Sequence, residues 1–180
     1  EDSGAAWYER AAATLGDWRA QGILTQDATP SLYGYEQHYT LGGRVLSRRG
    51  VLGAVRLTPW GQGIHRHERT RSGPRADRLR LMRATRAQLS PVFGLLHDAE
   101  GALSRWAQPP ADCELDFADA EGVRHRFWRI TDPAAIAALC AAVAERDIGI
   151  ADGHHRYETA LAYRDERRAA EGHPVTPQSY

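Results

Sequence analysis

The amino-acid sequence predicts an α+β fold, a mixed sheet with hairpins and packed helices. Two observations support this class. Strand-like segments come in pairs joined by glycine turns, at Gly42-Gly43 and at Glu121-Gly122, as in antiparallel hairpins. Helix-like segments do not follow every strand, as they would in a doubly wound parallel sheet. We therefore expect a single α/β domain over residues 1–180, with residues 111–130 as a possible inserted hairpin.

Apolar spacing and turn residues place the individual elements. The helices are defined by apolar residues at helical spacing, as at Trp7, Leu15 and Trp18. One of them has a clear start, with Thr131 or Asp132 as the cap before Pro133. Short apolar or aromatic runs define the strands. The sequence predicts helices over 5–20, 75–89, 131–146 and 157–170, and strands over 31–40, 44–57, 91–96, 112–118, 123–130 and 147–151.

Composition narrows the class of protein. Hydrophobic residues make up 42% of the chain, and no apolar run approaches the roughly 20 residues that span a bilayer. Cys113 and Cys140 have no metal-ligand or redox spacing, which favours reduced thiols. Because 23 basic residues balance 23 acidic ones, a nucleic-acid partner is not expected. We expect a cytoplasmic protein without a membrane partner, and an internal piece of a longer chain, since it begins without Met.

All basic residues other than histidine are arginines, and the chain has no lysine. A Schiff-base lysine for pyridoxal phosphate is therefore excluded, and so is a P-loop, which requires Gly-Lys-Ser/Thr. Any phosphate that this chain binds must be held by arginine, histidine, backbone N–H groups or a metal ion.

A strand–turn–helix with an unusual density of polar residues lies near the end of the chain. A short apolar strand leads into Asp152-Gly153, and His154-His155-Arg156 opens the next helix. The first N–H groups of a helix lack intrahelical partners, and the helix dipole adds positive charge there, so such a turn is suited to phosphate. The alternative is an ordinary helix start, with Asp152 as N-cap and solvated histidines.

A second polar segment surrounds Glu68. In a functional interpretation, Glu68 is a general base or a magnesium ligand, and Arg69 and Arg71 clamp phosphate. In a structural interpretation, the segment is a salt-bridged surface loop. A zinc interpretation joins His67 to Asp152 or to a histidine of the turn. The residues alone leave these alternatives open.

Several segments resemble one protein family in their order along the chain. The resemblance covers about 7–171 and identifies the chain as a member of the family named domain of unknown function 1015. The segments are His67-Glu68-Arg69-Thr70, Ser72-Gly73-Pro74, Asp77-Arg78-Leu79, Ala84-Thr85-Arg86, the residues 90–95 and the residues 150–160.

The Asp-Gly-His-His-Arg turn is also similar to that of free-serine kinases of the ParB/sulfiredoxin superfamily. This resemblance implies a nucleotide-dependent kinase for a small hydroxyl substrate, with Mg²⁺ and ADP or ATP as cofactors and free L-serine as the expected acceptor. Glu68 would be the catalytic base, and Asp152 would position substrate or magnesium. Gly153, His154, His155 and Arg156 would bind the nucleotide phosphates.

Two other functions are compatible with the same residues. One is a metal-dependent phosphatase or nucleotide hydrolase. The other is a ParB-like nucleotide-binding switch without strong catalysis, which the neutral charge disfavours. The metal, the phosphoryl donor and the oligomeric state are not determined by the sequence.

Overall fold

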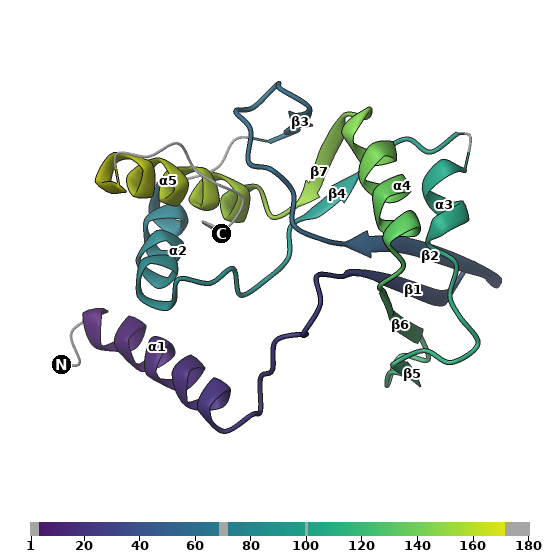
Figure 1. Cartoon of the computed structure of the whole chain (residues 1–180), viewed down its shortest axis with the longest axis horizontal. Coiled ribbons are helices and arrows are strands. Elements are labelled where there is room, and N and C mark those ends of the chain that lie inside the picture. Colours follow the sequence, from purple (N-terminus) through teal and green to yellow (C-terminus); the bar gives the residue numbers. More distant parts are fainter. Residues whose placement is uncertain (1–3, 69–71, 100, 172–180) are drawn as a thin grey trace. The chain divides into compact units, whose positions relative to one another are not determined.

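The computed structural model describes residues 4–68, 72–99 and 101–171. Contacts divide the chain into two compact units (Figure 1), where the sequence analysis expected a single domain. Unit 1 combines Glu1–Gln26, Leu57–Leu96 and Ile148–Tyr180. Unit 2 combines Asp27–Arg56 and His97–Asp147. Each unit therefore joins segments that are distant in the sequence.

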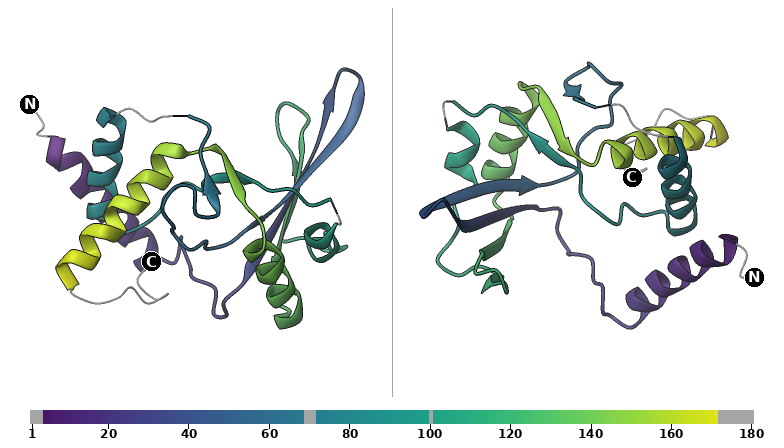
Figure 2. Two further views of the ribbon diagram at one scale, coloured as in Figure 1. Left: turned by 90° about the horizontal axis from the view of Figure 1, so that it is seen from above. Right: turned by 180° about the vertical axis from the view of Figure 1, so that it is seen from behind.

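Unit 1 contains a three-stranded sheet and three helices. The strand order is β3-β7-β4, in which β3 runs parallel to the central strand β7 and β4 antiparallel to it. Helix α2 packs against both α1 and α5, as Figures 1 and 2 show. The elements are α1 (Gly4–Ala20), β3 (Ile64–His65), α2 (Ser72–Thr85), β4 (Phe93–Leu95), β7 (Ile148–Asp152) and α5 (His154–Glu171).

The core of unit 1 lies between its sheet and the first turn of α5. Ile64, Ile150 and Tyr157 are buried, and Leu57, Trp60, Val92, Ile148 and Leu161 pack around them. The Tyr157 hydroxyl donates to the Thr58 carbonyl at 2.8 Å and accepts from the Thr58 N–H at 3.1 Å. Burial and these two bonds together hold the start of α5 against the sheet.

Unit 2 is a four-stranded antiparallel sheet with two helices. The strand order is β2-β1-β6-β5, so the predicted hairpin at 111–130 pairs with β1 and is continuous with this sheet. Asp132 caps α4 by accepting from the N–H groups of Ala134 and Ala135, with Pro133 in the first turn. The elements are β1 (Leu32–Leu41), β2 (Arg44–Leu52), α3 (Ala102–Trp106), β5 (Leu115–Ala118), β6 (Arg124–Ile130) and α4 (Pro133–Ala144).

The core of unit 2 is formed by Trp128, Ile130, Ala135 and Leu139. Gly34 of β1 faces Trp128 of β6, and a Cβ at Gly34 would lie 2.0 Å from the indole ring. Only glycine permits this close approach, which lets the indole lie flat on the sheet.

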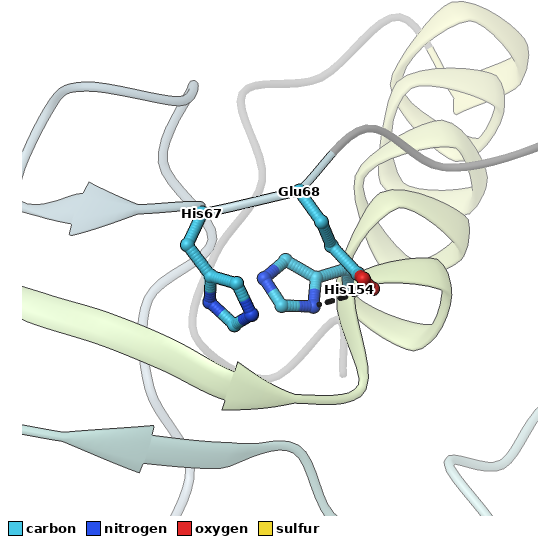
Figure 3. Close-up of side chains that lie close together, drawn as sticks. All are labelled: His67, Glu68 and His154. Atoms are coloured by element: carbon cyan, nitrogen blue, oxygen red, sulfur yellow. Dashed lines mark ion pairs between the residues drawn. The ribbon is translucent and has the colours of Figure 1, made fainter.

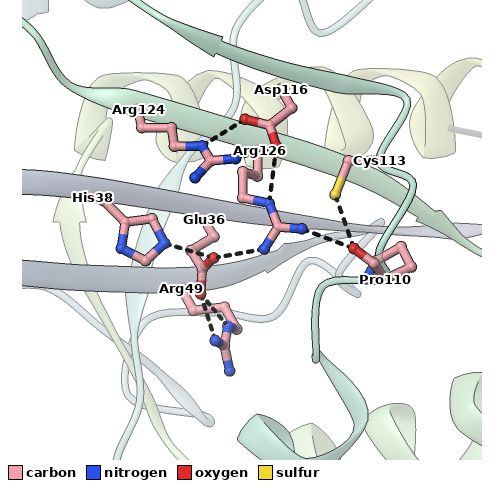
Figure 4. A network of polar contacts seen from close by, with 8 residues as sticks. All are labelled: Glu36, His38, Arg49, Pro110, Cys113, Asp116, Arg124 and Arg126. Carbon is pink, nitrogen blue, oxygen red and sulfur yellow. Dashed lines mark hydrogen bonds and ion pairs between the residues drawn. The ribbon is translucent and has the colours of Figure 1, made fainter.

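A buried carboxylate is the main polar feature of unit 2 (Figure 4). Glu36 is 2% exposed. It accepts hydrogen bonds from Arg49 Nε at 3.0 Å and from His38 Nε2 at 2.9 Å, and Arg126 Nη1 lies 3.5 Å away. Several cationic partners thus surround one buried anion, the condition under which a buried charge is tolerated.

The α+β class that the sequence predicts is confirmed, while several element bounds differ from the prediction. Strand β2 ends at Leu52 rather than at position 57, because Leu52 pairs with Tyr33 at the start of β1. Helix α2 ends at Thr85 rather than at position 89, because Arg86 adopts a left-handed conformation with φ of 51°. The short elements β3 and α3 were not predicted. In the described part of the chain, no helix is long and apolar enough to cross a membrane.

Candidate functional site

The polar strand–turn–helix lies at the junction of β7 and α5, entirely within unit 1. β7 ends at Asp152 and α5 begins at His154, so Gly153 alone forms the turn. Gly153 has a φ of 93°, and a Cβ there would lie 2.8 Å from Nε of Arg156. The backbone conformation therefore requires glycine, and the guanidinium of Arg156 lies close over the same position.

The start of α5 offers backbone donors. The first helical hydrogen bond runs from the Tyr157 N–H to the Gly153 carbonyl at 2.9 Å. The N–H groups of the three residues between them precede this bond and have no carbonyl four residues back within the helix. The helix dipole adds partial positive charge at the same end, so the turn attracts anions.

His154 is a buried polar residue at the start of α5. It is 2% exposed, and its ring stacks with that of Trp60 at a centroid distance of 6.4 Å. His67 lies edge-on to it, with ring centroids 4.5 Å apart. Nε2 of His154 is buried and has no hydrogen-bond partner among the residues that the structure describes. A buried polar atom of this kind is uncommon and costs stability unless something binds it.

Glu68 lies beside the turn through the pairing of β3 with β7. His65 pairs with Gly149 in this parallel ladder, and His67 Nδ1 then reaches the Ile150 carbonyl at 2.9 Å. Glu68 follows, and its Oε1 lies 3.1 Å from Nδ1 of His154, as Figure 3 shows. The structure thus brings together Glu68 and the turn, where the sequence analysis placed a base and a phosphate site.

Asp152 and Arg156 form an ion pair four residues apart across the turn. The Asp152 side chain is 74% exposed, whereas that of Arg156 is 26% exposed. The structure therefore gives Asp152 an ion-pair partner at the turn. Arg156 is held over Gly153.

The remaining predicted site residues are His155 and Arg69. His155 is half-buried, and its buried Nδ1 has no hydrogen-bond partner within residues 4–68, 72–99 and 101–171. His154 and His155 point in different directions, as expected for neighbours on a helix. Arg69 and Arg71 lie outside the described residues.

A small, open hollow adjoins the turn within unit 1. Arg156 and Thr159 of α5 line one part of it, and Arg78 and Leu81 of α2 line another. Met82 and Leu89 add apolar surface. The hollow thus combines two guanidinium groups with an apolar wall.

Sequence reasoning missed three parts of this site. Trp60 packs on both His154 and Tyr157, with a centroid distance of 4.7 Å to Tyr157. The carbonyl of Ile150 orients His67, and a backbone group carries no sequence signal. Strand β3, which positions His67 and Glu68, has two residues. Trp60 could have been noticed as a large aromatic residue in an otherwise polar, glycine-rich segment.

Comparison with known proteins identifies the family. The model of the family described as "Protein of unknown function (DUF1015)" matches residues 1–180, and the chain belongs to this family. The comparisons with curated proteins and with solved structures found no match.

Proposed function

We propose that this member of the DUF1015 family transfers a phosphoryl group from a nucleotide to a small hydroxyl substrate, with free L-serine as the first candidate. The strand–turn–helix would then be a phosphate site like that of ParB/sulfiredoxin-like free-serine kinases. The observation that carries the proposal is the contact of 3.1 Å between Glu68 and His154, at the N-terminal end of α5. This contact supports the proposal because a carboxylate can accept a proton and the start of a helix binds anions.

The chemistry assigned to these residues is an in-line displacement. The hydroxyl oxygen of serine attacks the terminal phosphorus of the nucleotide, and its proton passes to the Glu68 carboxylate. The bond between that phosphorus and the bridging oxygen breaks, and the leaving nucleotide keeps that oxygen with its charge. The products are phosphoserine and a nucleotide shorter by one phosphate. Such transfer depends on positioning and charge neutralisation more than on covalent chemistry.

The turn supplies that charge neutralisation. Backbone N–H groups at the start of α5 and the guanidinium of Arg156 would bind phosphate oxygens. Since Arg156 is already held by Asp152, it is positioned before any ligand arrives. The half-buried His155 lies at the same helix end, and its Nδ1 has no partner in the described part of the chain.

Mg²⁺ suits the oxygen ligands near the turn. The exposed carboxylate of Asp152 is a ligand of the type that magnesium prefers, and magnesium usually retains water and substrate phosphate as further ligands. When bound, the ion would neutralise phosphate charge. In this proposal Asp152 therefore forms an ion pair with Arg156 and also binds the magnesium ion that contacts the phosphate.

The hollow beside Arg156 is the candidate nucleoside site. Its lining by Leu81, Met82 and Leu89 offers an apolar surface for a base, while Arg78 and Arg156 lie on the phosphate side. No residue is assigned to the serine carboxylate.

Phosphorus NMR tests the proposal directly. The protein is incubated with Mg²⁺, serine and either ADP or ATP, and the spectrum is followed in time. We expect a phosphomonoester signal of phosphoserine to grow as the terminal nucleotide phosphate declines. Glu121→Gln, an exposed carboxylate on the β5–β6 turn, serves as the matched control and should retain the activity. Absence of phosphoserine with both nucleotides would refute the serine kinase assignment.

A metal-dependent nucleotide hydrolase is the second candidate, and one observation favours it. His67, Glu68 and His154 can present one ligand atom each within 4.8 Å of one another. In that case water replaces serine as the acceptor. The same spectra separate the two, because hydrolysis yields inorganic phosphate whether or not serine is present.

A further inference from the structure

A cluster of two histidines and one glutamate in unit 1 has the composition of a transition-metal site. It consists of His67, Glu68 and His154, drawn in Figure 3. One ligand atom from each lies within 4.8 Å of the others. A set of two histidines and one carboxylate is a known zinc ligand set, in which further coordination positions stay open to water or substrate.

The ring of His67 is oriented as a metal ligand requires. Its Nδ1 lies 2.9 Å from the carbonyl oxygen of Ile150, and a carbonyl can only accept. Nδ1 therefore carries the proton, and Nε2 carries the free lone pair. Metal-binding histidines usually donate their other ring N–H to a carbonyl or a carboxylate in this way.

The ring of His154 lies against the carboxylate of the same cluster. Its Nδ1 lies 3.1 Å from Oε1 of Glu68, close enough for both atoms to bind one ion. The ring then carries its proton on Nε2 and presents the lone pair of Nδ1 to the ion. Figure 3 shows the rings of His67 and His154 and the carboxylate of Glu68 close together.

The chemistry of the cluster selects the class of ion. Two imidazole nitrogens and one carboxylate suit zinc and its first-row neighbours, whereas Mg²⁺ prefers an all-oxygen environment. Imidazoles bind a metal in their neutral form, so a divalent cation held by two histidines and one carboxylate leaves a net positive charge beside the start of α5. The bound ion would therefore also favour an anion there.

We infer that His67, Glu68 and His154 bind one divalent transition-metal ion of the zinc class, with open coordination positions at the phosphate turn. The inference goes beyond the proposed phosphoryl transfer and does not depend on it. The metal site and the proposed proton transfer both use the carboxylate of Glu68. An ion bound to this carboxylate prevents it from accepting a proton. Zinc should therefore inhibit transfer to serine that Mg²⁺ supports.

Metal titration without nucleotide or serine tests the site. The metal-free 180-residue chain is titrated with Zn²⁺ in competition with a chromophoric chelator, and then with Co²⁺, whose visible absorption reports coordination by nitrogen. We expect one high-affinity zinc per chain and cobalt bands typical of four or five ligands. Millimolar Mg²⁺ should not displace the zinc.

Variants assign the ion to the cluster. His67→Ala, at an exposed side chain, should weaken zinc binding by at least about tenfold, since loss of even an outer partner costs about 10–100-fold. His154→Phe should do the same while it keeps a ring against Trp60, and circular dichroism checks that it folds. The matched control is His65→Ala, an exposed histidine two positions before His67 and outside the cluster.

Two results would overturn the inference. One is the absence of a tight zinc site in the wild-type chain. The other is zinc affinity in folded His67→Ala within twofold of that in His65→Ala, which would place the ion elsewhere, for example at Cys113 or Cys140. Because no nucleotide is present, a failure of kinase activity leaves this test unaffected, and loss of the metal site leaves the proposed kinase to be judged by its own assay.

Discussion

Two glutamates, one in each unit, lie in polar clusters of opposite character. Glu36 in unit 2 is 2% exposed and has Arg49, His38 and Arg126 around it (Figure 4). Glu68 in unit 1 has a side chain that is 56% exposed, and it contacts His154, whose other ring nitrogen is buried with no partner among the described residues. The first cluster has its anion enclosed and paired, and the second has an accessible anion and an unused buried nitrogen.

This difference indicates a structural role for the Glu36 cluster and a functional role for the Glu68 cluster. A buried carboxylate with several cationic partners contributes to the folded state, and removal of one member leaves uncompensated charge. A cluster with an exposed carboxylate and an unpaired buried atom is typical of a site that binds a ligand, since unpaired buried groups concentrate at functional sites. The comparison predicts that the same substitution will lower activity when it is made at Glu68 and stability when it is made at Glu36.

The largest expected effect is the loss of activity when Glu68 is substituted. Glu68→Gln removes the proton acceptor but keeps its size and most of its hydrogen bonding. Turnover in the phosphoryl-transfer assay should fall by roughly 10²–10⁴-fold, the usual contribution of general acid–base catalysis. The free energy of unfolding should change by no more than about 1 kcal/mol, as for an exposed pair. Near-normal turnover would show that Glu68 is not the general base.

The next effect is expected at Glu36 on stability. Glu36→Gln leaves two guanidinium groups facing a neutral amide in a buried place. The free energy of unfolding, from denaturant titration, should fall by roughly 3–5 kcal/mol, the range for breaking a buried ion pair. Glu68→Gln is the matched control. Equal losses of stability in the two variants would abolish the contrast between the clusters.

A smaller effect is expected at Arg156 on binding. Arg156→Ala removes a charged donor from the turn and releases Asp152. Nucleotide affinity, measured by calorimetry, should weaken by roughly 1.5–3 kcal/mol, the range for a hydrogen bond to a charged group. Arg83→Ala is the control, because Arg83 also pairs with an acid of α5, Glu166, but lies outside the turn. If both variants bound nucleotide equally well, Arg156 would have no part in the site.

The smallest effect concerns pH. Burial raises the pKa of the Glu36 carboxyl, and hydrogen bonds from Arg49 and His38 outweigh it, so the pKa lies below its ordinary value. A lowered pKa in the folded state gives stability that is present above the ordinary value of 4.5 and is lost as the pH falls through the folded value. The stability difference between wild type and Glu36→Gln should therefore shrink below about pH 4.5. A difference that stayed constant down to acid pH would contradict the assigned ion pairs.

The sequence predicted local features better than long-range ones. Pro133 with Asp132 marked the start of α4, and Gly153 marked the turn before α5, because both signals are confined to a few neighbouring residues. The pairing of β1 with β6 joins residues about 90 positions apart, as between Tyr35 and Phe127, and no local pattern encodes it. The division into two units follows from such pairings.

The candidate site was predicted in its residues but not in its internal contacts. Polar density singled out Glu68 and the turn at Gly153. Which histidine of the adjacent pair turns inward depends on how α5 packs against Trp60, and the burial of His154 followed only from that packing. The orientation of His67 depends on a backbone carbonyl of β7, which any residue type would supply.

The central claim is that the turn at the start of α5 binds the phosphates of a nucleotide, whereas the Glu36 cluster is structural. The most direct measurement is a titration of isotope-labelled protein with ADP and Mg²⁺, followed through its backbone amide signals. The account predicts saturable shifts at Gly153, His154, His155 and Arg156, the N–H groups that precede or open the helix, with the signals of β1 and β2 unchanged. Unchanged amide signals at the turn, or saturable shifts confined to unit 2, would contradict it.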